Sequence, residues 1–358
     1  MKLKIAIAAL FAALVTAMPT AARAAELSAL PEKYLTEQEL ELYRETLKNV
    51  VSVAEGKRSA EAFYITVSKP FPTKKAYEDA IEKVMFFIDN YTPEYSFWTD
   101  SRGYLVYDTA RCGLIYGISP AYQQSGNEKR MDAARLNDAK KALANAQAIV
   151  DKYEGKSDYE KVVGYTDEIC ALNEYNYDAL FAENIDPWSI VYVFDNDPST
   201  NVVCAGYARA FQYLCALGGI ECHYVTGSID GESHAWNIAV LDGESYFADL
   251  TACDGFPESD IKRYHPFVLG NVASNAQDGF STYFMYSGSL FSDMNTYKYG
   301  KEEMQYLPES LRTLSTKPLR KGGFHLELWH IPLIALIVGV VIRCIKRRKA
   351  SLDSSGDY

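Results

Sequence analysis

Two strand-like runs of residues, joined at Asp242-Gly243, constrain the fold of this chain more than any other feature. The first run extends over residues 234–241 and the second over 244–250. An Asp-Gly pair between two such runs is typical of a two-residue β-hairpin turn, because both turn positions need positive φ angles. The sequence therefore predicts an antiparallel pair of strands, in which Leu241 pairs with Glu244.

This register brings a histidine and a carboxylate together. It sets Trp236 opposite Asp249 and His234 opposite Thr251. His234 and Asp249 are then diagonal neighbours on one face of the hairpin, with about 7–8 Å between their backbone positions. A slip of one residue would move them to opposite faces. Asn237 is the rival partner for the histidine, but it lies on the other face of its strand. The hairpin thus predicts a general base, His234, oriented by Asp249.

Cys204 is the candidate nucleophile. The loop 196–201 carries several helix-capping residue types, and Tyr207, Phe211 and Leu214 follow at the spacing of one helical face. A helix there ends at Gly218-Gly219 and has Cys204 in its first turn, where free backbone N–H groups and the helix dipole favour a thiolate. A lone cysteine on an apolar helix is most often a small buried side chain. The helix-start position and the hairpin together favour catalysis.

The order and content of these motifs resemble the core of bacterial transglutaminase-like domains, over roughly residues 160–255. The resemblance rests on the following residues: Val203-Cys204-Ala205-Gly206-Tyr207-Ala208, Gly219-Ile220, Val225-x-Gly227, His234-Ala235-Trp236-Asn237, Asp242-Gly243 and Asp249-x-Thr251. It implies an α+β, papain-like fold in which the cysteine helix packs on a small antiparallel sheet.

The resemblance also implies a Cys204-His234-Asp249 triad that attacks amide carbonyls through a thioester. The chain departs from the family at Ala252-Cys253-Asp254, where an aromatic residue is usual. No polar side chain is evident for the oxyanion hole, and Tyr192 is our candidate for it. The backbone N–H of Cys204 supplies one donor in any case.

Three functions are compatible with such a site. A hydrolase, meaning a peptidase or amidase, is our first prediction because water is always available as the acceptor. A protein-crosslinking transglutaminase is the alternative, and a cell-surface binding protein that keeps the fold without the chemistry is the second alternative. The expected partner is a peptide or protein substrate, including the class of cell-wall peptides.

Neither a cofactor nor nucleic acid is expected. Cys222, His223 and Cys253 lack the CxxC or HxxxH spacing of a zinc site, so we predict no metal. The chain has 36 Lys+Arg against 47 Asp+Glu, for a net charge of −11. An acidic chain of this kind has no electrostatic footprint for nucleic acid.

The ends of the chain predict its location. Residues 1–24 have the basic start, apolar run and Ala22-Arg23-Ala24 cleavage pattern of a signal peptide. A second apolar run, within 328–345, is followed by a basic tail at 346–358, as expected on the cytoplasmic side of a membrane helix. We therefore expect a single-pass protein of the cell membrane with its catalytic domain outside.

The expected organisation between these ends has three parts. A mainly helical N-terminal domain covers 25–155, the transglutaminase-like domain covers 156–297, and a stalk covers 298–327. Six cysteines would lie outside the membrane: Cys112, Cys170, Cys204, Cys215, Cys222 and Cys253. If Cys204 stays a free thiol, the other five cannot all form disulfides, so at least one is a buried thiol or the compartment is weakly oxidising.

Overall fold

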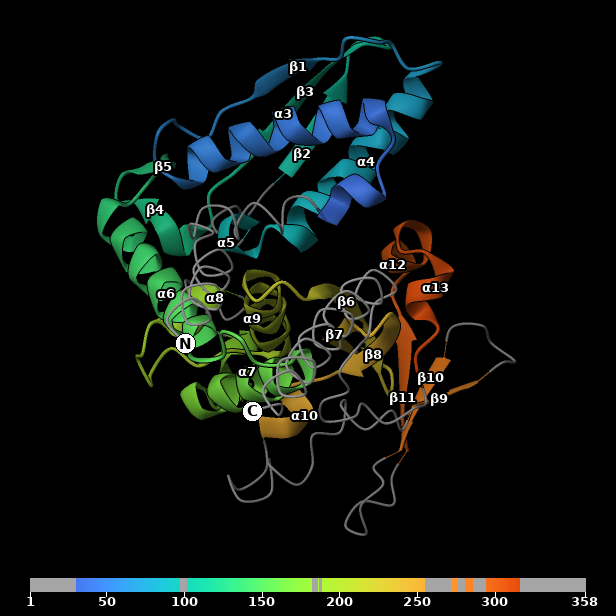
Figure 1. The fold of residues 1–358 in the computed structure, drawn as a ribbon. Helices are drawn as coiled ribbons and strands as arrows, with labels where there is room; N and C mark the ends of the chain where they lie inside the picture. The colour runs from blue at the N-terminus through green and yellow to red at the C-terminus, as the bar shows by residue number, and fades with distance from the viewer. Residues whose placement is uncertain are drawn as a thin grey trace, which may run out of the picture. The chain divides into compact units, whose positions relative to one another are not determined.

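The computed structural model describes residues 30–96, 102–181, 186, 189–254, 272–275, 281–285 and 294–315 (Figure 1). It is a mixed structure of helices and antiparallel sheets, which confirms the α+β class. The predicted signal peptide, membrane helix and tail lie outside the described residues. Within the residues that are described, no helix combines the length and apolar character needed to cross a membrane.

The hairpin register predicted from Asp242-Gly243 is confirmed. Strand β7 (Glu232–Leu241) pairs with β8 (Glu244–Ala248), with Leu241 opposite Glu244 and Asn237 opposite Ala248. Asp242 and Gly243 have φ angles of 53° and 76°, as the tight turn requires. Asp249 is the first residue after the ladder ends, so its side chain lies at the edge of the hairpin.

These two strands belong to a six-stranded antiparallel sheet in the order β8-β7-β6-β11-β10-β9. The remaining strands are β6 (Glu221–Ile229), β9 (Val272–Asn275), β10 (Ser281–Met285) and β11 (Met294–Tyr299). The pairing of β6 with β7 continues to a tight turn at Asp230-Gly231 and forms a second hairpin.

Gly227 allows β11 to join the sheet beside β6. A Cβ atom at Gly227 would lie 2.0 Å from the carbonyl oxygen of Lys298 and 2.8 Å from the Trp236 ring. No side chain fits in that space, so only glycine permits this close approach. The consequence is that Tyr297, on β11, reaches the face that carries the hairpin residues.

Helix α9 (Cys204–Leu217) packs against β6 and β7 on one side and against α6, α7 and α8 on the others. It is buried along nearly its whole length, as expected of a helix that is apolar all round. It ends at Gly218, and Gly219 follows with a φ of 78°. The surrounding helices are α6 (Ala133–Lys152), α7 (Asp158–Leu172), α8 (Ile190–Phe194) and the short α10 (Thr251–Asp254).

The start of α9 differs from our expectation in one respect. The residue at the N-cap is Val203, and no side chain caps the helix. The polar residues of the preceding loop instead hydrogen bond within the loop, as when Asp197 accepts from the backbone and hydroxyl of Ser199. The first N–H groups of α9 are therefore not taken by a capping side chain.

The N-terminal part combines long helices with strands. Helix α3 (Glu37–Ala54) begins at a capping box formed by Thr36 and Glu39, as the sequence predicts. Helix α4 (Lys74–Tyr91) follows. The same region contains a three-stranded sheet in the order β1-β3-β2. The strands are β1 (Phe63–Thr66), β2 (Arg102–Val106) and β3 (Arg111–Tyr116), so this part is less helical than expected.

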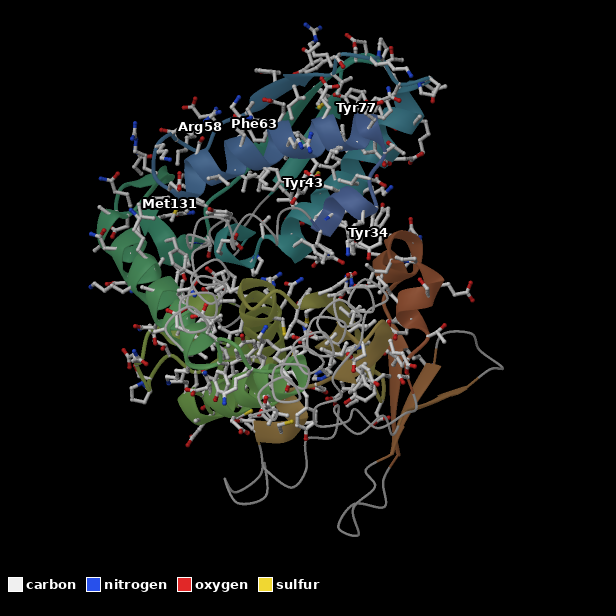
Figure 2. All side chains as sticks on the ribbon, viewed as in Figure 1. Tyr34, Tyr43, Arg58, Phe63, Tyr77 and Met131 are labelled. Atoms are coloured by element: carbon white, nitrogen blue, oxygen red, sulfur yellow. The ribbon has the colours of Figure 1, made fainter. Side chains whose placement is uncertain are left out.

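Short elements complete this region: η1 (Leu30–Lys33), α5 (Pro93–Ser96), η2 (Pro120–Tyr122), β4 (Gln123–Gln124), β5 (Asn127–Met131) and, after α7, η3 (Tyr177–Phe181). The side chains of Arg58 and Phe63 lie beside one another at the edge of the three-stranded sheet (Figure 2), with the guanidinium 5.8 Å from the ring centroid.

Residues 298–315, which we expected in a stalk, fold onto the large sheet. Residues 298 and 299 complete β11, and α12 (Lys301–Tyr306) and α13 (Glu309–Arg312) follow. Leu307 and Leu311 are buried, and Glu303 is only 1% exposed. Leu307 and Leu311, which lie among the prolines and charged residues of this segment, are thus part of the hydrophobic core. The rest of the predicted stalk lies outside the described residues.

Candidate active site

Cys204 is the first residue of α9 and the most accessible of the described cysteines. Its thiol is partly exposed, whereas Cys112, Cys170, Cys215, Cys222 and Cys253 are buried. All six are free thiols in the structure. The predicted position in the first helical turn is confirmed, and it leaves one thiol accessible to a substrate.

His234 and Asp249 meet as the hairpin register predicts. The Nε2 atom of His234 lies 2.8 Å from Oδ2 of Asp249, and the two side chains are only 9% and 3% exposed. The other carboxylate oxygen, Oδ1, accepts a hydrogen bond of 3.1 Å from the backbone N–H of Thr251. Since Nε2 is engaged with the carboxylate, Nδ1 is the ring nitrogen left to face the thiol.

The pKa of His234 is raised from 6.5 to about 10. Burial alone would lower it, but the charge and hydrogen bond of Asp249 outweigh burial, and the Cys204 side chain adds to the rise. His234 is therefore an imidazolium at neutral pH. The side chain of Cys204 is hydrogen bonded to this imidazolium.

Tyr297 is a member of this site that the sequence did not reveal. Its hydroxyl donates a hydrogen bond of 2.7 Å to Oδ2 of Asp249, the same oxygen that faces His234. Its buried ring also packs edge-on against Trp236, at 5.3 Å between centroids, and lies 6.0 Å from the His234 ring. Tyr297 therefore holds both the carboxylate and the imidazole in place.

Tyr175 is the second residue that sequence reasoning missed. Its hydroxyl lies against Cys204, so the pKa of Tyr175 is raised to about 12 by burial and by the charge of that thiol. The backbone N–H of Cys204 acts on the same hydroxyl in the opposite direction. The Tyr175 hydroxyl thus occupies the region where the backbone N–H of the nucleophile would bind an oxyanion.

The backbone around Tyr175 is held firmly. Its N–H donates to Oδ2 of Asp254 at 2.8 Å, and the N–H of Glu174 donates to Oδ1 of Asn201 at 3.1 Å. The N–H of Asn176 donates to the carbonyl of Val202 at 3.0 Å. Asp254, at which the chain departs from the transglutaminase-like pattern, therefore anchors the segment that carries Tyr175.

Tyr192, our sequence-based candidate for the oxyanion hole, has other neighbours. Its hydroxyl interacts with the backbone of Asp186, and charges on Asp186, Arg135 and Asp195 act on it. Tyr192 lines a surface cavity of about 300 Å³ together with Arg135 and Asp195. The structure thus brings Tyr175, and not Tyr192, to the thiol of Cys204.

Asn237, the rival partner for the histidine, has a structural role. Its side-chain amide donates to the carbonyl of Ala208 in α9 at 2.9 Å and to the carbonyl of His223 in β6 at 3.3 Å. It is fully buried and fastens the cysteine helix to the sheet. Asn237 therefore does not compete with Asp249.

His223, which we considered as a metal ligand, has other partners. Over the part of the chain that the structure describes, no group of three or more His, Cys, Asp or Glu side chains is arranged to hold a metal ion. His223 lies 2.6 Å from the Tyr91 hydroxyl through Nδ1 and 3.1 Å from Glu221 through Nε2. Both of its ring nitrogens thus have protein partners.

Comparison with known proteins gives distant similarity. No family model matches the chain. It is 24% identical over 184 residues to the kyphoscoliosis peptidase of Mus musculus, covering 48% of the chain and 26% of that protein. It is 25% identical over 134 residues to the human kyphoscoliosis peptidase, covering 34% of the chain and 19% of that protein. The chain thus spans about a quarter or less of the length of these relatives.

One solved structure is also similar. It is a crystal structure from Cytophaga hutchinsonii described as a candidate cysteine protease, with a TM-score of 0.25 and 15% sequence identity. The similarity covers 42% of this chain and 61% of the other.

Proposed function

We propose that this protein is a cysteine hydrolase that cleaves amide bonds in peptides or proteins through a thioester on Cys204. The observation that carries the proposal is the alignment of three groups: a partly exposed thiol at a helix start, a histidine with a raised pKa, and a buried carboxylate 2.8 Å from that histidine. The two relatives are both named peptidases, which supports hydrolysis as the reaction. The papain-like arrangement of a cysteine helix on an antiparallel sheet is part of the same proposal.

The mechanism follows from the positions of the groups. The Cys204 thiolate attacks the amide carbonyl, and the carbonyl oxygen becomes an oxyanion beside the backbone N–H of Cys204. The His234 imidazolium gives its proton to the leaving amine, and a thioester remains. Water then attacks the thioester while His234 accepts its proton, which releases the carboxylic acid and restores the thiolate–imidazolium pair. Asp249 stays hydrogen bonded to the ring and orients it.

Tyr175 completes the oxyanion hole in this proposal. The support is that the Tyr175 hydroxyl interacts with both the backbone N–H and the side chain of Cys204, so a substrate that takes over the N–H would leave this hydroxyl close enough to shift and donate to the oxyanion. Three hydrogen bonds hold the backbone around Tyr175 in place. They favour a role of Tyr175 as a hydrogen-bond donor over a role as a mobile segment that covers the thiol.

The location of the enzyme is also part of the proposal. The apolar runs at the two ends of the sequence support a membrane-anchored protein with the catalytic residues outside the cell. Its substrates would then be surface, secreted or cell-wall peptides.

The test is acyl-enzyme trapping combined with isotope labelling. The full chain is incubated in H₂¹⁸O with a peptide library, and both protein and products are analysed by mass spectrometry. We expect acylation at Cys204 and ¹⁸O in the new carboxylate. Cys204→Ser should abolish product, whereas Cys112→Ser, in the N-terminal sheet, should leave it unchanged. Full product formation by the Cys204→Ser variant would rule out the proposal, and amine transfer without ¹⁸O would replace hydrolysis by transamidation.

A further inference from the structure

Arg209 lies on the cysteine helix, five residues after the nucleophile. Five residues correspond to about 7.5 Å along the helix axis, a distance that a long side chain can span. Its side chain turns to strand β6, where the guanidinium carbon lies 5.0 Å from the centroid of the Tyr224 ring. Such stacking over an aromatic face holds a guanidinium in a defined position.

Arg209 and Cys204 border the same group of side chains. Ala205, Ala208, Tyr224 and Ala235 form a small apolar cluster apart from the main core, and Cys204 packs against it. The charge of Cys204 also acts on the Tyr224 hydroxyl. Ala235 directly follows His234 in the chain. The Tyr224 ring that supports Arg209 is therefore part of the immediate surroundings of the active site.

Arg209 also forms a hydrogen bond with the Tyr224 side chain, which uses part of its donor capacity. Its Nε atom is buried and has no hydrogen-bond partner among the described residues. The ion pairs formed within the described ranges do not include Arg209. Arg209 as a whole is partly exposed, so part of its guanidinium remains open to an anion from solvent.

One acidic side chain lies nearby but is already engaged. Glu303 acts electrostatically on Tyr224, yet its Oε1 atom accepts hydrogen bonds from the backbone N–H of Thr226 at 2.9 Å and from the hydroxyl of Thr226 at 2.7 Å. Glu303 therefore serves β6, and among the residues that the structure describes no ion pair joins it to Arg209.

We propose that Arg209, supported on Tyr224, is an anion-binding subsite that recognises a carboxylate of the substrate next to the amide bond attacked by Cys204. A guanidinium presents paired N–H donors that match the two oxygens of a carboxylate, and peptides carry carboxylates on acidic side chains and at the C-terminus. The chain as a whole has a net charge of −11 and repels anions, so a preference for them must come from a local group. This inference rests on the proposed function of Cys204.

The test uses alkylating probes that differ by one charge. N-iodoacetylglycine and N-iodoacetylglycinamide carry the same reactive group, and only the first has a terminal carboxylate. N-iodoacetyl-aspartic acid α-amide and N-iodoacetyl-asparagine α-amide form the matching pair for a side-chain carboxylate. The measured quantity is the second-order rate of alkylation of Cys204 in the full chain, resolved by mass spectrometry.

We expect the wild-type protein to react about tenfold faster with the carboxylate member of at least one pair, as a charge-assisted hydrogen bond provides. The pair that shows the preference identifies the source of the carboxylate. Arg209→Gln should remove the preference and leave the rate with the neutral probe unchanged. Arg209→Lys should retain part of it, and Arg135→Gln, which removes an exposed charge elsewhere, should retain all of it.

Two results overturn the subsite: equal rates with charged and neutral probes in the wild type, or a preference that persists in Arg209→Gln. If Arg209→Gln also slows the neutral probe, the Arg209→Lys variant decides, since loss of the whole preference there would contradict a charge-based subsite. Failure of all probes to favour Cys204 over the buried cysteines would be a different result, because it removes the nucleophile itself and with it the proposed function.

Discussion

Replacement of Asp249 by asparagine tests the electrostatic basis of the site. A rise in the pKa of His234 from 6.5 to about 10 corresponds to a preference for the imidazolium of roughly 5 kcal/mol. Asp249 is the main source of the rise, with a smaller contribution from Cys204, while burial acts against it. Asparagine has nearly the same shape but no charge, so burial then dominates. We expect the pKa of His234 to fall below 6.5 in Asp249→Asn.

Imidazole NMR titration of the solubilised full chain measures this change directly. The chain contains five histidines, so the His234 signal can be assigned by substitution. At neutral pH the variant should have lost the imidazolium, and turnover should fall by about 10²- to 10⁴-fold, the usual contribution of a general acid–base. Asn237→Ala is the comparison on the same hairpin, because Asn237 contacts Ala208 and His223 and should leave the titration of His234 unchanged.

The same shift predicts how stability depends on pH. Because the pKa of His234 is raised in the folded state, its interaction with Asp249 stabilises the protein fully below pH 6.5 and is lost as the pH rises through about 10. The difference in free energy of unfolding between wild type and Asp249→Asn should therefore be largest in the acidic range and shrink towards pH 10. A wild-type His234 that titrates within half a unit of the variant would refute this reasoning.

Four further predictions concern other parts of the structure. Cys204 should be alkylated ahead of the five buried cysteines at mildly acidic pH, and His234→Ala should slow the alkylation of Cys204 itself because the sulfur loses its cationic neighbour; an unchanged rate in the variant would contradict it. Tyr297→Phe should lower kcat/KM by roughly tenfold or more through the lost hydrogen bond to Asp249, whereas Tyr299→Phe, on the same strand, should have little effect. Gly227→Ala should destabilise the protein by about 1–3 kcal/mol or more through its clash with Lys298, measured as a lower Tm, while Gly103→Ala, where no atom lies within 4 Å, should be tolerated. Protease treatment of intact cells should cleave within residues 160–255, and protection of that region while the membrane is whole would refute the proposed topology.

The local features of the site were predictable because they depend on neighbours in the sequence. The turn at Asp242-Gly243 sets which residues pair across the hairpin. Successive side chains along a strand point to opposite faces, and this alternation sets which residues share a face. These two facts were sufficient to predict that His234 and Asp249 meet. The helix start at Cys204 followed similarly from apolar spacing, although its cap did not, because the loop residues found partners in their own turns.

The tertiary structure decided the remaining parts of the site. Tyr297 lies 48 residues after Asp249 in the sequence and reaches it only because β11 inserts next to β6 at Gly227. Tyr175 precedes the nucleophile by 29 residues and reaches it through tethers to Asn201 and Asp254. No local periodicity encodes such contacts, since they depend on how distant segments pack.

The sequence by itself thus determined the helix that carries the thiol, the hairpin that carries its base, and the register that pairs that base with Asp249. Only the tertiary structure determined which tyrosine approaches the thiol, how the carboxylate is held, and where Arg209 lies. The physical reason is that turn geometry and side-chain alternation act over a few residues, whereas burial and long-range hydrogen bonding depend on the whole packed chain.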